Sequence, residues 1–491
     1  MPGDIPDLRF RLPETFAVQP ELVIDEGPAR GLLIGQNAPR EEFDAVFLGK
    51  HAEAPHKTVW LDARGAHAVY VMGKRRSGKS YTLGAIAEAL VSDTWLRQGG
   101  ASQAVLILDS MNVFLTMPFT VEATYSASSA GMKELHKWGI QSDDVPVRLF
   151  TPHGSTVPRD VQAQGITLRA SDLGIEEWCG LFEVDPFVDP LGHLMATLFA
   201  KVADEGYIDS IGGGHVAPKS EFSIEDMLKA LSVDPDLAGF VQDTRDALRR
   251  RLETLVRFPL FGAAGLDVRD LLRPGTISVL LLRDLDQEMR SVMVSIVVKR
   301  MMRLRAVSEQ QERMVPVHLA RAEKYASSDP GQASVEREHA EECLRKAAAG
   351  LPRSWLIIDE AHNYIPSRST VPSRRPLKKY VDEGRNLGLS IVVATQQPSG
   401  LDPSIQRNAD VLLVHALSHH DDIAAAQGMI NSAEPEEVVL DGKYRITGPR
   451  LFERLVRALP LGYALASTDR ANRLFPVRIR PRSTVHGGAD Y

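Results

Sequence analysis

Gly73-Lys74-Arg75-Arg76-Ser77-Gly78-Lys79-Ser80 is the stretch that decides the fold of this chain. It matches the pattern G-x-x-x-x-G-K-[ST] in full, between the apolar run 66–72 and the helix-like run 81–90. A strand, a glycine loop and a helix in this order form a phosphate-binding P-loop. The glycines let backbone N–H groups surround phosphate oxygens, and the start of the helix adds partial positive charge. The pattern therefore predicts nucleotide binding.

Each position of this loop has an expected role. Lys79 would reach the β- and γ-phosphates of a nucleotide, and the Ser80 hydroxyl would bind Mg²⁺. We therefore expect ATP and Mg²⁺ as cofactors. The expected nucleotide contacts are Gly73, Arg76, Ser77, Gly78, Lys79, Ser80 and Tyr81.

The bulk composition is that of an ordinary globular protein of several domains. Of 491 residues, 44% are hydrophobic and 25% charged, and the formal net charge is −7. Any contact with nucleic acid must therefore come from a local basic patch. Two cysteines cannot make a disulfide framework, no apolar run approaches the ~20 residues that span a bilayer, and the first residues do not resemble a leader. We expect a cytoplasmic protein with no membrane partner.

A second half of a hydrolysis site lies in Trp355–Glu360, which reads WLIIDE. The apolar residues predict a buried strand, and Asp359 at its carboxyl end would hold Mg²⁺. Glu360 would then polarise the attacking water as general base. Downstream of a P-loop, this carboxylate pair predicts nucleotide hydrolysis.

Other polar side chains are candidates for the same reaction. Gln396 ends the apolar strand 390–395 and could contact the γ-phosphate or orient water without adding charge. Arg385 could serve as an arginine finger from a neighbouring subunit, with Arg407 and Arg283 as alternatives.

Asp109 ends the apolar run 104–109 and has two open interpretations: a carboxylate that faces the site, or a cap of the loop that follows.

Buried strand patterns that alternate with helical patterns predict an α/β fold with a mostly parallel sheet. Short apolar pieces before residue 65 predict a small β module, and helical spacing within 165–260 predicts a helical insertion. The polar stretch 306–350, which includes the helix-like run 336–348, follows the helix expected at 287–305 and predicts a long insertion or a mobile segment. The pieces of the β module are 32–34, 45–48 and 58–61, and the later core strands are 276–282, 355–360, 390–395 and 411–416.

The chain resembles the HerA/FtsK superfamily of ring ATPases, and within it the HerA branch, over about residues 20–490. The resemblance rests on GKRRSGKSYTLG (73–84), LILDSMNVF (106–114), LRPGTISVLLL (272–282), WLIIDEAHNYIP (355–366), EGRNLGLSIVVATQQPSGLDPSIQRNADV (383–411) and PVRIRPRSTVHGG (476–488). It implies a RecA-like P-loop NTPase core with a β-barrel-like N-terminal module, a helical insertion and a C-terminal arm that braces the next subunit. The corresponding boundaries are 1–65 for the β module, 66–165 and 270–460 for the core, 166–269 for the insertion and 461–491 for the arm.

The resemblance also implies a role for each matching residue. Gly73–Ser80 becomes the nucleotide cradle, Asp359 and Glu360 the Walker B pair, Gln396 the sensor and Arg385 an arginine that acts in trans. Three features depart from the family pattern. Residues 109–114 lack the Gly and Glu of D-x-x-G-E-[FY], Gln397 stands where the family often has Arg, and the N-terminal region is short.

The letters DEAH at 359–362 also occur in two-lobed helicases. Those proteins need a second lobe with the motif Q-x-x-G-R-x-G-R, which does not occur after Val411, and His362 is then an incidental neighbour. His419-His420-Asp421-Asp422 has the composition of a metal cluster, but adjacent ligands on one short segment cannot converge on one ion, which favours a surface loop.

The family resemblance implies a homo-hexameric ATPase, a helicase or translocase that moves double-stranded DNA. A nuclease or other effector partner would serve DNA end processing or antiphage defence. The basic segment 367–385, with pore contacts from 366–379, would touch phosphates without reading sequence. The alternative is an ATP-binding oligomeric scaffold that assembles and activates an effector with little or no translocation. Only the first hypothesis predicts that duplex DNA stimulates ATP hydrolysis.

Overall fold

The structure is a computed structural model. It describes residues 8–11, 23–24, 31–35, 44–52, 56–141, 144–430, 437–440, 444–447, 450–468 and 473–488.

The core of the molecule is one half of a long twisted sheet, and in this half all neighbouring strands are parallel. Its order is β10-β9-β13-β8-β14-β15-β6-β16. This topology confirms the expected α/β class with a mostly parallel sheet. The strands are β6 (Ala68–Met72), β8 (Ala104–Asp109), β9 (Val147–Pro152), β10 (Ala163–Ile166), β13 (Thr276–Leu281), β14 (Ser354–Ile358), β15 (Leu389–Thr395) and β16 (Val411–Val414).

These strands are apolar throughout because helices cover both faces of the sheet. Successive residues enter opposite cores: Tyr70 and Met72 pack in one cluster, Val69 and Val71 in the other. Helices α1 (Lys79–Val91) and α3 (Ala130–Trp138) cover the second face, and α10 (Gln287–Tyr325) and α12 (Arg374–Glu383) cover the first. The shorter helices are α2 (Val121–Thr124), α9 (Val268–Leu271), α13 (Pro403–Asn408), α14 (His420–Met429) and α15 (Leu451–Ala458).

The sheet continues beyond β16 as a mostly antiparallel half that joins the two ends of the chain. Its order is β19-β20-β4-β5-β3-β2, and β7 pairs with β4. The strands expected at 32–34, 45–48 and 58–61 are confirmed, and β20 links them to the core. A barrel-like module of its own remains a prediction, because much of 1–65 lies outside the described residues. The bounds are β2 (Val23–Ile24), β3 (Gly31–Ile34), β4 (Ala45–His51), β5 (Thr58–Asp62), β7 (Arg97–Gln98), β19 (Tyr463–Thr468) and β20 (Arg473–Ile479); β1 (Leu8–Arg11), β17 (Glu437–Leu440) and β18 (Tyr444–Thr447) form a separate sheet.

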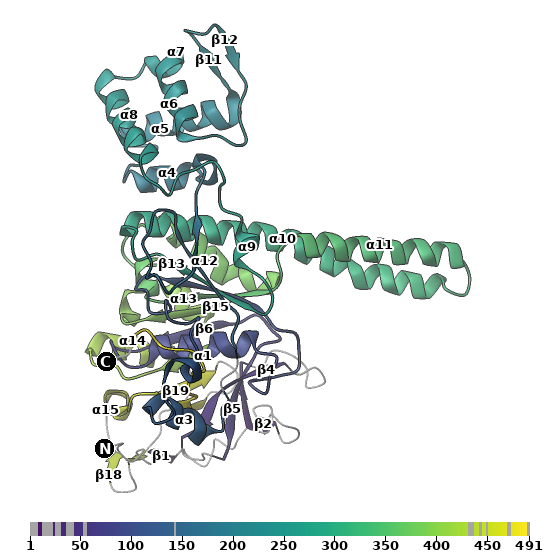
Figure 1. The fold of residues 1–491 in the computed structure, drawn as a ribbon, viewed down its shortest axis with the longest axis vertical. Helices are drawn as coiled ribbons and strands as arrows, with labels where there is room; N and C mark the ends of the chain where they lie inside the picture. Colours follow the sequence, from purple (N-terminus) through teal and green to yellow (C-terminus); the bar gives the residue numbers. More distant parts are fainter. Residues whose placement is uncertain are drawn as a thin grey trace.

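A helical lobe stands at one end of the molecule, at the top of Figure 1. Its helices fall within the range expected for a helical insertion, and a short β-hairpin accompanies them. The elements are α4 (Ile175–Leu181), α5 (Pro190–Ala200), a π-helix (Lys201–Glu205), β11 (Tyr207–Asp209), β12 (Gly214–Val216), α6 (Ile224–Val233), α7 (Pro235–Ala238) and α8 (Gln242–Val256). The apolar side chains of the lobe are continuous with the core beneath it.

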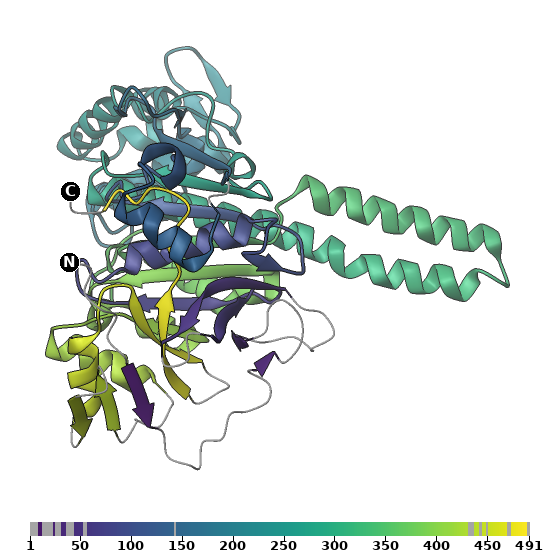
Figure 2. The ribbon, with the colours of Figure 1, turned by 60° about the horizontal axis from the view of Figure 1, so that its bottom comes forward.

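Of the two possibilities expected for 306–350, the structure shows an insertion and not a mobile segment, and the helix-like run 336–348 lies within a longer helix. Helix α10 continues to Tyr325 and α11 (Pro330–Ala349) packs back along it, forming a hairpin that projects from the body in both views (Figures 1 and 2). The buried face of α11 consists of Ala333, Glu336 and Ala340. Small and charged residues at this spacing do not give the apolar pattern that marks a helix in sequence.

One buried arginine fixes the root of this hairpin to the body. The Arg305 side chain is fully buried and forms an ion pair with Glu312. Its guanidinium also donates to the carbonyls of Leu387 (2.6 Å) and Leu351 (3.2 Å). Leu387 ends the short 3₁₀ helix Gly384–Leu387, which carries Arg385.

The C-terminal residues pack on the P-loop helix of their own chain. The fully buried Glu88 carboxylate accepts hydrogen bonds from Arg480 (3.0 Å), Arg482 (3.2 Å) and Thr484 (2.6 Å). Burial alone would raise the pKa of Glu88, but the two guanidinium groups hold it below its ordinary value. Bracing of a neighbouring subunit by this arm remains a prediction. Within the described part of the chain, no helix combines the length and the apolar character needed to cross a bilayer.

Candidate active site

Three neighbouring strands bring the expected site residues to one edge of the sheet. β15 lies between β6 and β14, and all three are parallel. The P-loop follows β6, Asp359 and Glu360 follow β14, and Gln396 follows β15. Because the carboxyl ends of parallel strands share an edge, residues more than 300 positions apart in sequence meet there. We call this the carboxyl edge.

The backbone of the P-loop depends on its two glycines. A Cβ on Gly73 would come within 2.4 Å of Ser77 Oγ and 2.7 Å of His415 Cβ, and Gly78 adopts a φ of 103°. The loop is anchored to both neighbouring strand ends, because Gly73 N donates to Thr395 O (3.3 Å) and Lys74 N to Ala416 O (2.7 Å). The loop geometry therefore needs Gly at both positions.

Two polar side chains of the loop, Lys79 and Ser77, are buried. Lys79 is buried, and its Nζ donates to the carbonyl of Lys74 (3.1 Å). Burial lowers the pKa of Lys79, and the carboxylates of Glu360 and Asp359 act in the opposite direction. Ser77 Oγ is buried without a hydrogen-bond partner in the described part of the chain. Unsatisfied buried polar groups are costly and often mark a ligand site, and here a phosphate would satisfy them.

Ser80 and Asp359 form the point of contact between the two halves of the site. Ser80 Oγ donates to Asp359 Oδ2 at 2.7 Å, and Glu360 N donates to the other carboxylate oxygen at 3.0 Å. Burial, followed by the charge of Glu360, raises the pKa of Asp359 to about 6. A hydroxyl and a buried carboxylate with excess negative charge are the hard oxygen ligands that Mg²⁺ prefers. The residues present therefore fit the expected ion.

The backbone of Glu360 has a strained conformation that the surrounding structure must hold in place. Its φ of 52° is in the left-handed region, which is unfavourable for a non-glycine residue and is found mostly at functional sites. Its Oε1 accepts a hydrogen bond from Gln396 Nε2. Its Oε2 is buried and has no hydrogen-bond partner among the described residues. One carboxylate oxygen is thus fixed, and the other is available as a base.

Two histidines beside this site were not predicted from the sequence. His362 Nδ1 lies 3.4 Å from Glu360 Oε2 and 3.2 Å from Thr395 Oγ1, and burial together with the charge of Lys79 lowers its pKa. His362 is therefore a neutral neighbour of the proposed base. The letters DEAH place His362 two residues after Glu360, but they do not show the backbone turn at Glu360 that brings the two side chains together.

His415 supports the P-loop from beneath. Its ring nitrogens contact Thr82 Oγ1 (3.0 Å) and the carbonyl of Tyr463 (2.8 Å). Complete burial lowers its pKa to about 4, and the imidazole is neutral. The sequence places His415 directly after an apolar run, but it does not show that this strand, β16, is the neighbour of β6.

Asp109 caps the loop that follows it. Its carboxylate accepts hydrogen bonds from the backbone N–H groups of Phe114 (2.7 Å) and Met111 (3.0 Å). Burial raises its pKa to about 6 despite these bonds. Of the two interpretations left open, the contacts favour the loop cap.

The expected site residues do not all meet. The Tyr81 hydroxyl accepts a hydrogen bond from Arg482 N (2.8 Å) and thereby holds the C-terminal segment. Arg385 precedes β15 and therefore lies at the opposite edge of the sheet, which we call the amino edge. There its guanidinium forms an ion pair with Asp410 at 2.8 Å.

The alternative arginines divide between the edges. Arg407 precedes β16 at the amino edge, whereas Arg283 follows β13 at the carboxyl edge, and both are exposed. Arg75 and Arg76 are exposed on the P-loop itself.

No family model and no curated protein matches the chain. Among solved structures, VirB4 of Thermoanaerobacter pseudethanolicus is similar with a TM-score of 0.51 and 13% identity, over 91% of this chain and 97% of that one. The plasmid coupling protein TrwB in complex with ADP and Mg²⁺ follows with a TM-score of 0.46 and 14% identity, over 86% of each chain. The genome packaging NTPase B204 of Sulfolobus turreted icosahedral virus 2, in complex with AMP, has a TM-score of 0.29 and 9% identity over 84% of this chain and 96% of that one. The likeness to VirB4 extends over nearly the whole chain and confirms the fold class.

Proposed function

We propose that this chain is an ATPase of the HerA/FtsK superfamily that couples ATP hydrolysis to movement along double-stranded DNA. The observation that carries the proposal is the carboxyl edge itself. There the serine of a P-loop touches a buried acid, and the next residue is a strained glutamate with one free oxygen. The fold shared with VirB4 supports the proposal, as does the agreement of six separated sequence motifs with one superfamily.

The chemistry follows from the placement of these side chains. Lys79 and the backbone of the loop would hold the phosphates, and Ser80 and Asp359 would hold Mg²⁺, whose charge favours phosphoryl transfer. Glu360 Oε2 would accept the proton of the attacking water, while Gln396 fixes the orientation of the carboxylate through Oε1. The strained backbone at Glu360 holds the carboxylate at this position before substrate binds.

A second subunit would complete the site. The amino edge presents Arg385 with 41% of its side chain exposed, far along the strands from the P-loop of the same chain. If the amino edge of one subunit faced the carboxyl edge of the next, Arg385 would reach the γ-phosphate in trans. We propose a homo-hexameric ring in which every site is assembled in this way.

In the basic segment 367–385, fewer Arg and Lys side chains are available to bind DNA than the sequence implies. The Arg374 guanidinium is engaged by Asp402 (2.8 Å), and Arg375 forms an ion pair with Glu176 (2.6 Å). Arg368 and Lys378 are exposed and form no ion pair within the described part of the chain, and Lys379 lies 3.8 Å from Glu383 in an exposed pair of little strength. We propose Arg368, Lys378 and Lys379 as phosphate contacts.

The decisive experiment measures ATP turnover with and without linear duplex DNA, together with the mass of the particle in solution. We expect duplex DNA to stimulate turnover of a hexamer. Reversal of charge at Lys378 and Lys379 should weaken the stimulation and lower the slope of log affinity against log salt by about 2. The same reversal at Lys133 and Lys137, two exposed lysines on α3, is the matched control.

A nucleotide-dependent ring whose turnover ignores DNA would contradict the motor. That result would support the alternative function, an oligomeric scaffold that activates an effector. A nuclease or other effector partner, and a role in DNA end processing or antiphage defence, belong to the proposal in either case. Copurification with the product of a neighbouring gene tests them.

A further inference from the structure

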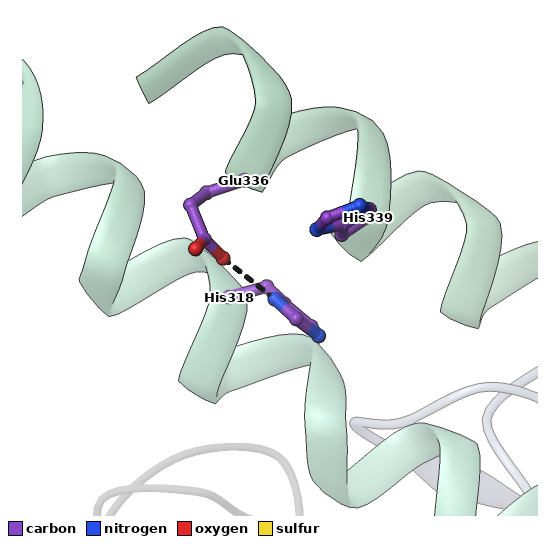
Figure 3. Close-up of side chains that lie close together, drawn as sticks. All are labelled: His318, Glu336 and His339. Carbon is purple, nitrogen blue, oxygen red and sulfur yellow. Dashed lines mark hydrogen bonds and ion pairs between the residues drawn. The ribbon is translucent and has the colours of Figure 1, made fainter. Parts of the chain in front are cut away.

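The projecting hairpin brings together three side chains that have no part in the proposed ATPase. His318 lies on α10, and Glu336 and His339 lie one turn apart on α11 (Figure 3). One ligand atom from each residue lies within 4.8 Å of the other two. We propose that these residues form a binding site for a divalent transition metal, of which Zn²⁺ fits best.

The geometry of the cluster fits one small ion. His318 Nδ1 lies 2.7 Å from Glu336 Oε2, and the imidazole rings of His318 and His339 have centroids 5.3 Å apart. Ligands about 2.0–2.2 Å from a tetrahedral Zn²⁺ ion are separated by a little over 3 Å. Binding therefore needs the His318 and Glu336 ligand atoms to move slightly apart, and ligand atoms that lie up to 4.8 Å apart to move closer, which side-chain rotation can supply.

The donor set selects the class of metal. Two imidazoles and one carboxylate suit Zn²⁺ and similar transition metals, whereas Mg²⁺ and Ca²⁺ require oxygen donors. Sites with three protein ligands of the His₂Glu type leave a fourth position for water or another ligand. The histidine cluster and the nucleotide site thus differ in ligand chemistry, and we expect Mg²⁺ to bind only at the nucleotide site.

The burial of Glu336 distinguishes this cluster from an ordinary ion pair on the protein surface. Glu336 is only 7% exposed, and it lies on the face of α11 that packs against α10, between the buried Ala333 and Ala340. His318 is partly buried and His339 is exposed, which leaves the site open on one side. A carboxylate on the inner face of a helix pair is costly unless it is paired.

The hydrogen bond to His318, 2.7 Å long, pairs this carboxylate. A hydrogen bond alone would account for Glu336 and His318. It gives no role to His339, whose ring stands beside both of them on the open side.

A metal here would join two helices of a hairpin that projects from the body (Figures 1 and 2). Because His318 comes from one helix and the other two ligands from the next, the ion would fix the distance and register of α10 and α11 near the middle of the projection. Metal binding to the folded hairpin adds stability as the logarithm of metal concentration. The predicted effect is local, in the hairpin and not in the sheet.

The test is zinc titration of the full-length chain without a histidine tag, after treatment with a chelator and in excess Mg²⁺ so that the nucleotide site is filled. We expect one saturable Zn²⁺ per chain, and Co²⁺ in its place should give the visible absorption of a low-coordinate site. Removal of a ligand in His318→Ala, His339→Ala or Glu336→Gln should weaken binding by more than the ~100-fold that loss of an outer-shell partner costs. Glu338→Gln changes an exposed acid on the same helix and should bind Zn²⁺ as the unchanged chain does.

Hydrogen exchange provides a second measurement that does not depend on activity. Zn²⁺ should slow exchange of the amides around 314–343 in the unchanged chain and in Glu338→Gln, and it should have no effect there in His318→Ala. Equal binding in all variants would overturn the proposal, because it would locate the ion elsewhere. Absence of saturable binding would overturn it as well, and would leave the cluster as an inter-helix hydrogen bond.

Discussion

The two edges of the central sheet differ in whether their buried polar and charged groups have partners. At the carboxyl edge, Ser77 Oγ and Glu360 Oε2 are buried without hydrogen-bond partners in the described structure, and the backbone of Glu360 is strained. At the amino edge, Asp410 accepts from His67 Nδ1 (2.7 Å) and pairs with Arg385 (2.8 Å). One edge is incomplete without a ligand, whereas the other is largely satisfied within the chain.

This difference shows where binding energy can be gained. An edge with unsatisfied groups gains stability when a nucleotide and a cation bind, because those groups then find partners. An edge of paired groups gains little from a ligand, but it holds Arg385 in a fixed position. If the ring is as proposed, each interface joins an incomplete edge to a complete one.

The most severe way to disturb the carboxyl edge is Glu360→Gln. We expect turnover to fall by about 10³-fold or more, because the general base is lost while the shape of the side chain is kept. ATP binding should remain. Phosphate release and nucleotide affinity are measured side by side, with Glu383→Gln, an exposed acid on α12, as control. Sustained hydrolysis in Glu360→Gln would remove Glu360 as the base.

Arg385→Ala tests whether the two edges work together. An arginine finger contributes ~10³–10⁵ in rate, and we expect a loss at the lower end, about 10³-fold. Mixing Arg385→Ala subunits with Glu360→Gln subunits should restore part of the activity, since some interfaces then combine an intact arginine with an intact base. No recovery at any mixing ratio would argue against action in trans.

The amino edge should show its pairing in the pH dependence of stability. Burial opposes the charged form of His67, but hydrogen bonds to Asp410 and Asp62 outweigh it and raise the pKa of His67 from 6.5 to about 9. The resulting stabilisation is complete below pH 6.5 and is lost as the pH rises through 9, at a cost of about 3 kcal/mol. Denaturant unfolding between pH 6 and 10 measures it.

The variant His67→Gln isolates this effect. It should flatten the decline in stability between pH 6.5 and 9, since the group whose pKa is raised is gone. A decline of unchanged steepness in His67→Gln would assign the pH dependence to other groups.

The smallest of these effects is expected for Lys79→Ala. Loss of one charge-assisted hydrogen bond to phosphate costs about 2 kcal/mol, which corresponds to roughly 30-fold weaker nucleotide binding. Titration with a nucleotide measures it. Lys133→Ala, which changes an exposed lysine on α3, should bind nucleotide as the unchanged chain does.

Most of the fold could be predicted from the sequence. The strands of a parallel sheet covered on both faces are short continuous runs of apolar residues, and such runs can be found in the sequence. WLIIDE and AVLILD are of this kind, and both became central strands. The hairpin could not be predicted in the same way. Its inner face uses Ala333, Glu336 and Ala340, and Pro316 lies within α10 as a false signal for a helix end.

The candidate site was predictable where one motif carries both the residue and its place. Gly73–Ser80 and Asp359-Glu360 follow strands that the same letters predict. His362 and His415 could not be placed, because their contacts depend on which strands are neighbours and on how the backbone turns at Glu360. A sequence pattern predicts where a strand ends, but it does not predict the order of the strands in the sheet, which decides which strand ends lie side by side.

Arg305 gives the projecting hairpin a mechanical meaning. The arginine is a pivot: it donates to the carbonyl of Leu387, the last residue of the 3₁₀ helix that begins at Gly384 and carries Arg385. Beyond the pivot α10 runs on to Tyr325, a lever arm of about 30 Å at 1.5 Å per residue. Any partner that grips the tip would exert a torque at the root, and the backbone next to Arg385 would be the first to bear it.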